Sequence, residues 1–162
     1  RSLMGTEIER KFRVRHTDFL VGATGQWLCQ GYLSHQAEAT VRVRMDDDGA
    51  WLTIKGVTQG ATRREFEYPI PPDDARIMLD EMCPAGRIEK TRFRIPAPPH
   101  VWEVDVFAGD NEGLVVAEIE LSDENEAFEH PEWLGAEVTD DPRYYNSELS
   151  RHPWRLWSGG TE

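Results

Sequence analysis

Acidic and basic residues alternate with apolar ones near the start of this chain. Over Glu7–Arg15, EIERKFRVR, the residues Glu7, Glu9 and Lys11 recur at every second position, as the side chains on one face of a β-strand do. The other face is apolar except at Arg10. Neighbouring side chains on one strand face lie about 6 to 7 Å apart. Two carboxylates followed by an ammonium group can therefore hold a cation and a phosphate side by side.

The same alternation recurs in later segments, each with charged residues at every second position and mostly apolar residues between them. The charged positions are Arg42 and Arg44, Lys55, Glu65 and Glu67, Lys90 and Arg92, Glu103 and Asp105, and Glu118 and Glu120. One such segment alone would also fit an edge strand with a solvated face. The recurrence instead favours a single charged surface built from many strands.

These segments predict an antiparallel protein of about eight strands. After the first strand, we expect strands at 26–34, 40–45, 50–57, 63–70, 87–95, 101–108 and 113–122, and a short extra strand at 133–138. The acidic stretch Asp46–Gly49 is typical of a hairpin turn. A helix of about ten residues is expected after Pro72. The tail 140–157 is predicted to be helical, with Asp140 or Asp141 as its cap.

Length and composition limit the class of protein. The 162 residues (18.6 kDa) suffice for one domain with its own core, expected over 4–157. We interpret Met4 as the natural start and residues 1–3 as a cloning remnant. Only Cys29 and Cys83 are present, which argues against a disulfide framework or a thiolate metal site and favours a cytoplasmic protein. No apolar run could span a membrane, and the net charge of −12 argues against nucleic-acid binding.

Strands that are charged on one face and apolar on the other must bury one of the two. The fold class we expect is α+β, mainly β: a closed eight-stranded antiparallel barrel with a charged interior and helices against its outer wall. All three lysines, Lys11, Lys55 and Lys90, fall on the charged faces. Unpaired buried charges are costly, so such an interior would suit a polyanion bound together with divalent cations. Carboxylates suit Mg²⁺ or Mn²⁺, and basic side chains suit phosphoryl oxygens.

The motifs together resemble the CYTH superfamily, the triphosphate tunnel metalloenzymes, over essentially the whole chain. The N-terminal ExExK motif of that family is met by Glu7, Glu9 and Lys11. Its later motifs are met in order by RxR at Arg42 and Arg44, TxK at Lys55, ExE at Glu65 and Glu67, KxR at Lys90 and Arg92, ExD at Glu103 and Asp105, and ExE at Glu118 and Glu120. The segment Tyr144–Ser147 is similar to the helix that plugs the tunnel in small bacterial members.

The resemblance implies a role for each motif residue. The implied metal ligands are Glu7, Glu9, Asp105, Glu118 and Glu120. The implied substrate-binding residues are Lys11, Arg42, Arg44, Lys55, Lys90 and Arg92. Supporting carboxylates that orient these cations would be Glu65, Glu67 and Glu103. The expected catalytic residues are Lys11, Lys90, Glu9 and Glu120.

The activity implied by the resemblance is hydrolysis of inorganic triphosphate to diphosphate and phosphate, with two Mg²⁺ or Mn²⁺ ions as cofactors. Within the same family, a class IV adenylate cyclase or a thiamine or nucleoside triphosphatase is the alternative, with Trp27, Tyr32 and Trp51 as candidates for stacking on a nucleoside. A non-catalytic polyphosphate-binding module is an alternative of another class. The expected partner is a small-molecule triphosphate. The sequence leaves open whether the protein forms a homodimer.

Overall fold

The computed structural model describes residues 6–157, and side chains from Ile8 onward. The proposed start at Met4, the proposed remnant and the Glu7 side chain lie outside the described residues. The strands are β1 (Thr6–Val14), β2 (Gly25–Gln36), β3 (Ala39–Asp46), β4 (Gly49–Lys55), β5 (Thr62–Ile70), β6 (Arg87–Ala97), β7 (His100–Phe107), β8 (Val115–Glu120) and β9 (Leu134–Glu137). The α-helices are α1 (Pro72–Glu81) and α2 (Asn146–Arg151). None of the described helices is long and apolar enough to cross a membrane.

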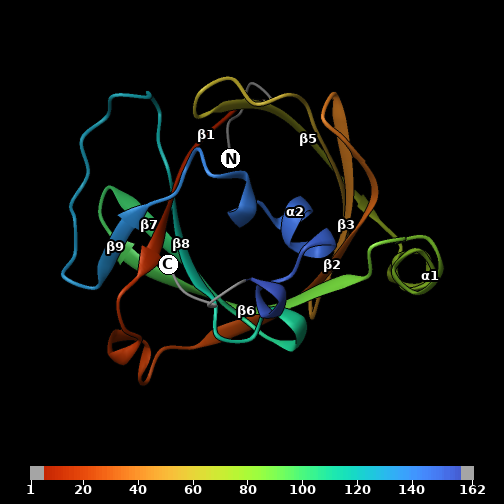
Figure 1. The fold of residues 1–162 in the computed structure, drawn as a ribbon, viewed down its shortest axis with the longest axis horizontal. Helices are drawn as coiled ribbons and strands as arrows, with labels where there is room; N and C mark the ends of the chain where they lie inside the picture. Colours follow the sequence, from red (N-terminus) through yellow and green to blue (C-terminus); the bar gives the residue numbers. More distant parts are fainter. Residues whose placement is uncertain (1–5, 158–162) are drawn as a thin grey trace.

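The strands close into a ring, which confirms the predicted barrel (Figure 1). Their order is β5-β4-β3-β2-β6-β7-β8-β1, and β1 pairs with β5 to complete the circle. Every pairing is antiparallel. The short strand β9, expected as an extra strand, pairs with β1 outside the ring. Side chains alternate between the two sides of each strand, so every second residue of all eight strands points into the ring.

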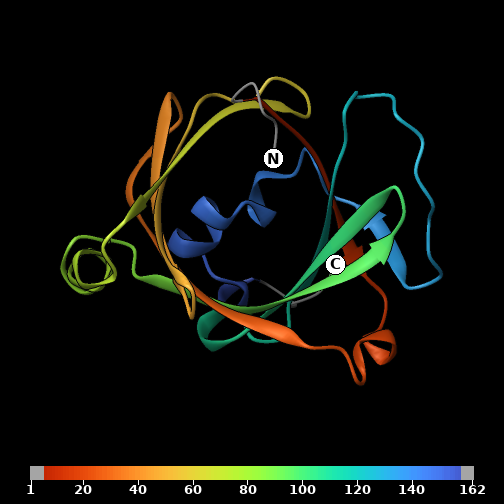
Figure 2. The ribbon, with the colours of Figure 1, turned by 180° about the vertical axis from the view of Figure 1, so that it is seen from behind.

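The outer wall is covered in two places. Helix α1 lies outside the ring, where Ala75 and Leu79 pack against Val43 and Ala50 of the wall (Figure 2). At Gly31, any Cβ would lie 2.6 Å from the sulfur of Cys83, so this close approach favours glycine. On another part of the wall, a cluster that includes Phe12 and Trp102 is covered by Phe128 and Trp133 of the segment after β8.

Arg10, the one charged residue on the apolar face of β1, is explained by this second covering. Its guanidinium lies 3.3 Å from the carboxylate of Glu137 on β9 and donates to the carbonyl oxygen of Glu124 at 2.9 Å. Thr62, on β5, donates to the Glu124 carboxylate at 2.8 Å. Arg10 therefore ties the segment after β8 to the barrel rather than facing an apolar layer.

One end of the barrel interior is apolar and is filled by the C-terminal segment. Ile88, Phe107 and Val116 are on the inward faces of β6, β7 and β8, and they pack with Tyr144 and Leu149. Both views show α2 inside the ring of strands (Figures 1 and 2). The inward face of these strands thus changes from apolar to charged along their length, and the tail plugs the apolar end, in agreement with the predicted plug.

The tail is not one continuous helix, which corrects the expectation of helix over 140–157. It consists of a 3-10 turn at Pro142–Tyr144, α2, and a second 3-10 turn at Trp154–Leu156. Asp141 caps the first turn by accepting from the backbone N–H of Arg143 at 3.1 Å. Pro153 has no backbone N–H to continue α2, and the segment bends to follow the barrel interior. The expected hairpin turn at Asp46–Gly49 is present.

Candidate active site

A cavity of about 400 Å³ lies within the barrel, and the three lysines of the chain all line it. The sequence motifs meet there as expected. The predicted site residues on its wall are Glu9, Lys11, Arg42, Arg44, Lys55, Glu65, Glu67, Lys90, Arg92, Glu103, Glu118 and Glu120. Glu7 is paired through its backbone with Arg63 of β5, and its predicted role as a metal ligand stays a prediction. Asp105 is not among the lining residues and lies behind them.

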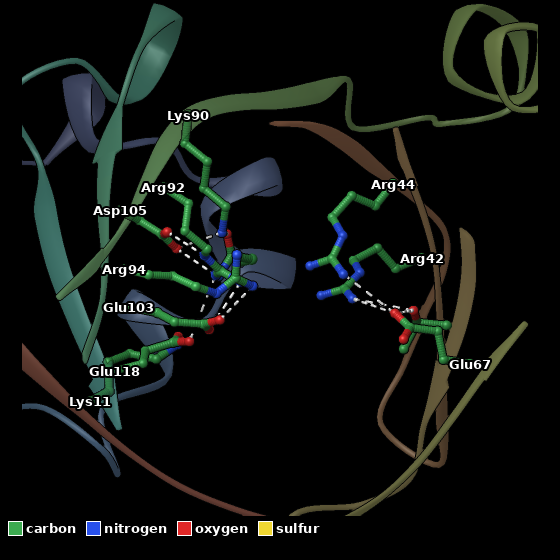
Figure 3. Close-up of polar contacts among 12 residues, drawn as sticks. Lys11, Arg42, Arg44, Glu67, Lys90, Arg92, Arg94, Glu103, Asp105 and Glu118 are labelled. Carbon is green, nitrogen blue, oxygen red and sulfur yellow. Dashed lines mark hydrogen bonds and ion pairs between the residues drawn. The ribbon is translucent and has the colours of Figure 1, made fainter. Parts of the chain in front are cut away.

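Asp105 holds two of the basic residues in place. It is 2% exposed, and its carboxylate accepts two hydrogen bonds from the Arg92 guanidinium, at 2.7 and 2.9 Å. The ammonium group of Lys90, also 2% exposed, lies 2.8 Å from the same carboxylate (Figure 3). Burial would raise the pKa of Asp105, but Arg92 and Lys90 outweigh it and hold that pKa well below its usual range. Asp105 is therefore an anion fully engaged by the chain's own cations.

Lys90 and Lys11 have opposite electrostatic settings although both residues are buried. Burial lowers the pKa of Lys90 to about 8. The attraction of Asp105 offsets only part of this effect, and repulsion from Arg92 adds to it. Burial also disfavours the charged form of Lys11, but the carboxylates of Glu118 and Glu9 outweigh it and raise the pKa of Lys11. The ammonium of Lys11 lies 3.2 Å from Glu118. Lys11 is thus firmly cationic, whereas Lys90 is a cation whose charge a bound anion would stabilise.

On the opposite wall, Arg42 and Arg44 project toward the Lys90 side across the cavity (Figure 3). They share the carboxylate of Glu67, at 4.0 Å from Arg42 and 3.4 Å from Arg44. Among the described residues, the buried Nε atoms of both arginines lack a hydrogen-bond partner. Burial, together with the charges of Arg42 and Arg92, lowers the pKa of Arg44 to about 10. This half of the site carries more positive than negative charge and is suited to an anion.

Carboxylates face one another in register on the β1, β7 and β8 part of the wall. Glu9 is directly opposite Glu120, and Glu103 is directly opposite Glu118. Like charges at such positions destabilise a sheet unless cations lie between them. The Arg92 guanidinium lies 3.1 Å from the carboxylate of Glu103 and 3.9 Å from that of Glu118. The pair Glu9 and Glu120 lines both the main cavity and a neighbouring one of about 390 Å³.

This donor set fits a divalent cation, because hard carboxylate oxygens face each other at the edge of an open cavity. Among the residues whose side chains are described, no group of three or more histidine, cysteine, aspartate or glutamate side chains is arranged closely enough to form a metal site. Binding would therefore require small movements of the carboxylates or ligands from the substrate. Magnesium sites commonly take part of their coordination from substrate phosphates and water.

The remaining wall contains the supporting residues. Lys55 on β4 is directly opposite Glu65 on β5, and Thr53 is opposite Glu67. The Thr53 hydroxyl donates to the Glu67 carboxylate at 3.2 Å and accepts from Arg42 at 3.2 Å. Glu67 thus contacts both arginines and Thr53, and its supporting role stays a prediction. Of the three aromatic candidates for nucleoside stacking, Tyr32 lines the cavity and Trp27 and Trp51 do not.

Comparison with known proteins identifies the family. A model of the CYTH domain matches residues 5–150. The chain belongs to the CYTH family. Two similar CYTH relatives are both named inorganic triphosphatase. The one from Acetivibrio thermocellus is 46% identical over 152 residues, covering 94% of this chain and 97% of that protein. The one from Nitrosomonas europaea is 37% identical over 150 residues, covering 90% and 97%.

Solved structures agree with the CYTH assignment. A crystal structure of an inorganic triphosphatase matches with a TM-score of 0.64 at 32% identity, covering 90% of this chain and 97% of that one. A protein from Pyrococcus horikoshii matches with a TM-score of 0.56 at 20% identity, covering 73% and 80%. The second likeness concerns the fold alone.

The cavity of this CYTH chain also contains residues that the sequence motifs did not include. Arg63 and Arg94 line it, and each continues a recognised alternation by one step: Arg63 precedes Glu65, and Arg94 follows Arg92. Extending the period of two would have found both. Tyr145, Asn146 and Ser147 line it as well, although they were expected only as part of a plug. No strand periodicity could have identified them, because they come from the tail.

The anchoring of the plug predicts a pH dependence of stability. The ring nitrogen Nε2 of His35 lies 2.9 Å from the hydroxyl of Ser150, which itself donates to the carbonyl oxygen of Ser147. Burial, and then the nearby charge of Arg151, lowers the pKa of His35 from its ordinary 6.5. The unfolded chain therefore binds this proton more readily, so the contribution of His35 to stability is present above 6.5 and is lost as the pH falls below it.

We expect the melting temperature to fall less on acidification from about pH 7.5 to about pH 5 in His35→Gln than in the unmodified protein. The measurement is thermal unfolding at a series of pH values. The same change at the exposed His152 is the control and should leave the slope unaltered. Parallel curves for the His35→Gln and unmodified proteins would contradict the prediction.

Proposed function

We propose that the protein hydrolyses inorganic triphosphate to diphosphate and phosphate, and that it does so with divalent cations. The observation that carries the proposal is one cavity within the barrel that places basic residues on two opposite walls and facing carboxylates beside one of them. A linear anion with several charges can contact both walls at once. The two relatives named inorganic triphosphatase, similar over nearly their whole length, support this choice of substrate.

The basic residues would grip the two ends of the substrate. We assign one terminal phosphate to Arg42 and Arg44, whose guanidinium groups project into the cavity with few acidic partners. The rest of the chain would extend to Lys11, Lys90 and Arg92 on the opposite wall. Charge-assisted hydrogen bonds from guanidinium groups to phosphoryl oxygens are short and strong. Because Asp105 already fixes Lys90 and Arg92, these cations need little rearrangement when substrate binds.

The carboxylates Glu9, Glu118 and Glu120 would hold Mg²⁺ or Mn²⁺, with Glu7 as a further proposed ligand. We propose two ions in the active complex. Bound there, they supply neutralisation of phosphoryl charge and a water of lowered pKa. Asp105 is proposed to act chiefly through Lys90 and Arg92, since both cations already occupy its oxygens.

In the reaction, the oxygen of a water forms a bond to the terminal phosphorus, and the bond from that phosphorus to the bridging oxygen breaks. The bridging oxygen keeps the electron pair and leaves as part of diphosphate, and the water proton goes to solvent. Phosphoryl transfer needs positioning and stabilisation of charge spread over the equatorial oxygens. Lys11, Lys90 and Arg92 provide that stabilisation from fixed positions on β1 and β6.

The test is phosphate release from tripolyphosphate, ATP, thiamine triphosphate and diphosphate, each with Mg²⁺, Mn²⁺ or EDTA. We expect release from tripolyphosphate that exceeds release from the others and disappears in EDTA. Formation of cyclic AMP from ATP would support the cyclase alternative. Binding of tripolyphosphate without turnover of any substrate would leave a polyphosphate-binding module in place of the proposed enzyme.

The metal assignment predicts the behaviour of Glu9→Gln. Removing one of two facing carboxylates should raise the metal concentration required for half-maximal activity by about tenfold, because one anionic ligand is lost. The measurement is a titration of Mg²⁺ and of Mn²⁺ at saturating tripolyphosphate. Glu112→Gln, at an exposed site away from the cavity, is the control. An unchanged metal requirement in Glu9→Gln would contradict the assignment.

A further inference from the structure

The C-terminal segment gives one oxygen to each of the two buried lysines of the active site. The ammonium of Lys11 donates to the backbone carbonyl oxygen of Tyr144 at 3.3 Å. The ammonium of Lys90 donates to the side-chain oxygen Oδ1 of Asn146 at 3.1 Å. These contacts join β1 and β6 to the tail at the wall of the cavity. The tail is therefore part of the site that holds the lysines, in addition to filling the apolar end of the barrel.

The contact with Lys90 fixes which way the Asn146 amide points. An ammonium group has only donors, so the atom that faces Lys90 must be the carbonyl oxygen and not the nitrogen. The NH₂ group of Asn146 is consequently turned away from Lys90. It makes no hydrogen bond to any residue that the structure describes, and Asn146 lines the cavity. The side chain thus offers donors where an anion would bind.

We propose that Asn146 is a substrate-binding residue: its NH₂ group donates to a phosphoryl oxygen of the bound triphosphate while its Oδ1 holds Lys90. The choice of triphosphate as ligand rests on the proposed function. An amide suits both tasks, since it accepts from a lysine and donates to an anion without adding charge. A carboxylate at this position would hold Lys90 at least as well but would repel the phosphate.

That difference separates substrate binding from a purely structural role. If Asn146 only ties the tail to β6, Asn146→Asp should be harmless, because aspartate has the same shape and still accepts from Lys90. If Asn146 binds phosphate, Asn146→Asp loses the donor and places a negative charge against the substrate. Asn146→Ala removes both functions without adding charge. Asn146→Ala is therefore the more harmful substitution if the role is structural, and Asn146→Asp is the more harmful one if Asn146 binds phosphate.

The experiment measures the KM and kcat for tripolyphosphate with Mg²⁺, the dissociation constant of tripolyphosphate by calorimetry in EDTA, and the melting temperature of each ligand-free protein. For Asn146→Asp we expect the KM and dissociation constant to rise by at least about tenfold, with a melting temperature equal to or above that of the unmodified protein. Asn146→Ala should show a smaller rise. Asn125→Asp, the same change on a distant exposed segment, should alter neither constant.

Unchanged KM and dissociation constant in Asn146→Asp would overturn the proposal, as would a lower melting temperature in Asn146→Ala with unchanged affinity. Failure of the proposed function gives a different result. An unmodified protein that binds tripolyphosphate without hydrolysing it would remove the triphosphatase assignment, and the calorimetric comparison would still decide the role of Asn146. An unmodified protein that binds no tripolyphosphate would overturn both.

Discussion

Asp105→Asn is expected to lower the free energy of unfolding by about 3 to 5 kcal/mol, the range seen when one partner of a buried ion pair is removed. The carboxylate of Asp105 is 2% exposed and lies within hydrogen-bond distance of both Lys90 and Arg92. Asparagine keeps the volume but not the charge, so two buried cations would lose their main counterion. Urea unfolding in the absence of phosphate would measure the effect.

An exposed ion pair on the same protein is a matched control. Asp110 lies 3.0 Å from Arg155, and both side chains are well exposed. Asp110→Asn should therefore cost at most about 1 kcal/mol. Tripolyphosphate should raise the melting temperature of Asp105→Asn more than that of the unmodified protein, because a bound anion replaces the missing charge. Equal losses of stability in the two variants would contradict the structural role of Asp105.

Arg44→Met should have opposite effects on activity and stability. Loss of a charge-assisted hydrogen bond worth about 3 kcal/mol should lower kcat/KM for tripolyphosphate by about 100-fold. Without an anion, however, the folded protein should be as stable as before or more so. Burial and repulsion from Arg42 and Arg92 already disfavour the Arg44 cation, and its Nε atom lacks a partner among the described residues. Steady-state kinetics and thermal unfolding of the ligand-free protein would measure both effects.

Arg94→Met is the comparison for this variant. Arg94 also lines the cavity, but its side chain is 58% exposed and is paired with Glu103. Solvent screens such a charge, so kcat/KM should fall by less than about tenfold. Glu67 retains contacts with Thr53 and Arg42 when Arg44 is replaced. A clear loss of stability in Arg44→Met, or activity close to that of the unmodified protein, would contradict the assignment of Arg44 to the anion site.

The walls of the site were predictable because a strand has a period of two. Once Glu9 and Lys11 were assigned to one face, the same rule placed Arg42, Lys90 and Glu118 on the inward faces of other strands. Closure of the barrel followed from the need to bury one face of every strand. The sequence could not separate carboxylates that would bind metal from carboxylates that hold basic side chains in place. Alternation assigns Asp105 to the inward face, but it does not reveal the contacts of Asp105 with Lys90 and Arg92.

The tail was the part of the site that the sequence described least well. Its apolar residues predicted a long helix, whereas the structure bends at Tyr145 and again at Pro153 to fit inside a barrel. Such bends depend on the shape of the surrounding wall rather than on local propensity. The contact between Asn146 and Lys90 joins residues that are 56 positions apart, and no local pattern indicates it.

The same long-range contacts determine when this protein can fold during its synthesis. The bond from Lys11 to the carbonyl of Tyr144 spans 133 residues, and β1 pairs with β8 and β9, which are translated long after it. A nascent chain therefore leaves the β1 edge that pairs with β8 and β9 unpaired until those two strands have been made. Non-local strand pairing slows folding and exposes unpaired edges to aggregation. The tail, which follows all the described strands in the sequence, then fills the barrel and completes the setting of its two buried lysines.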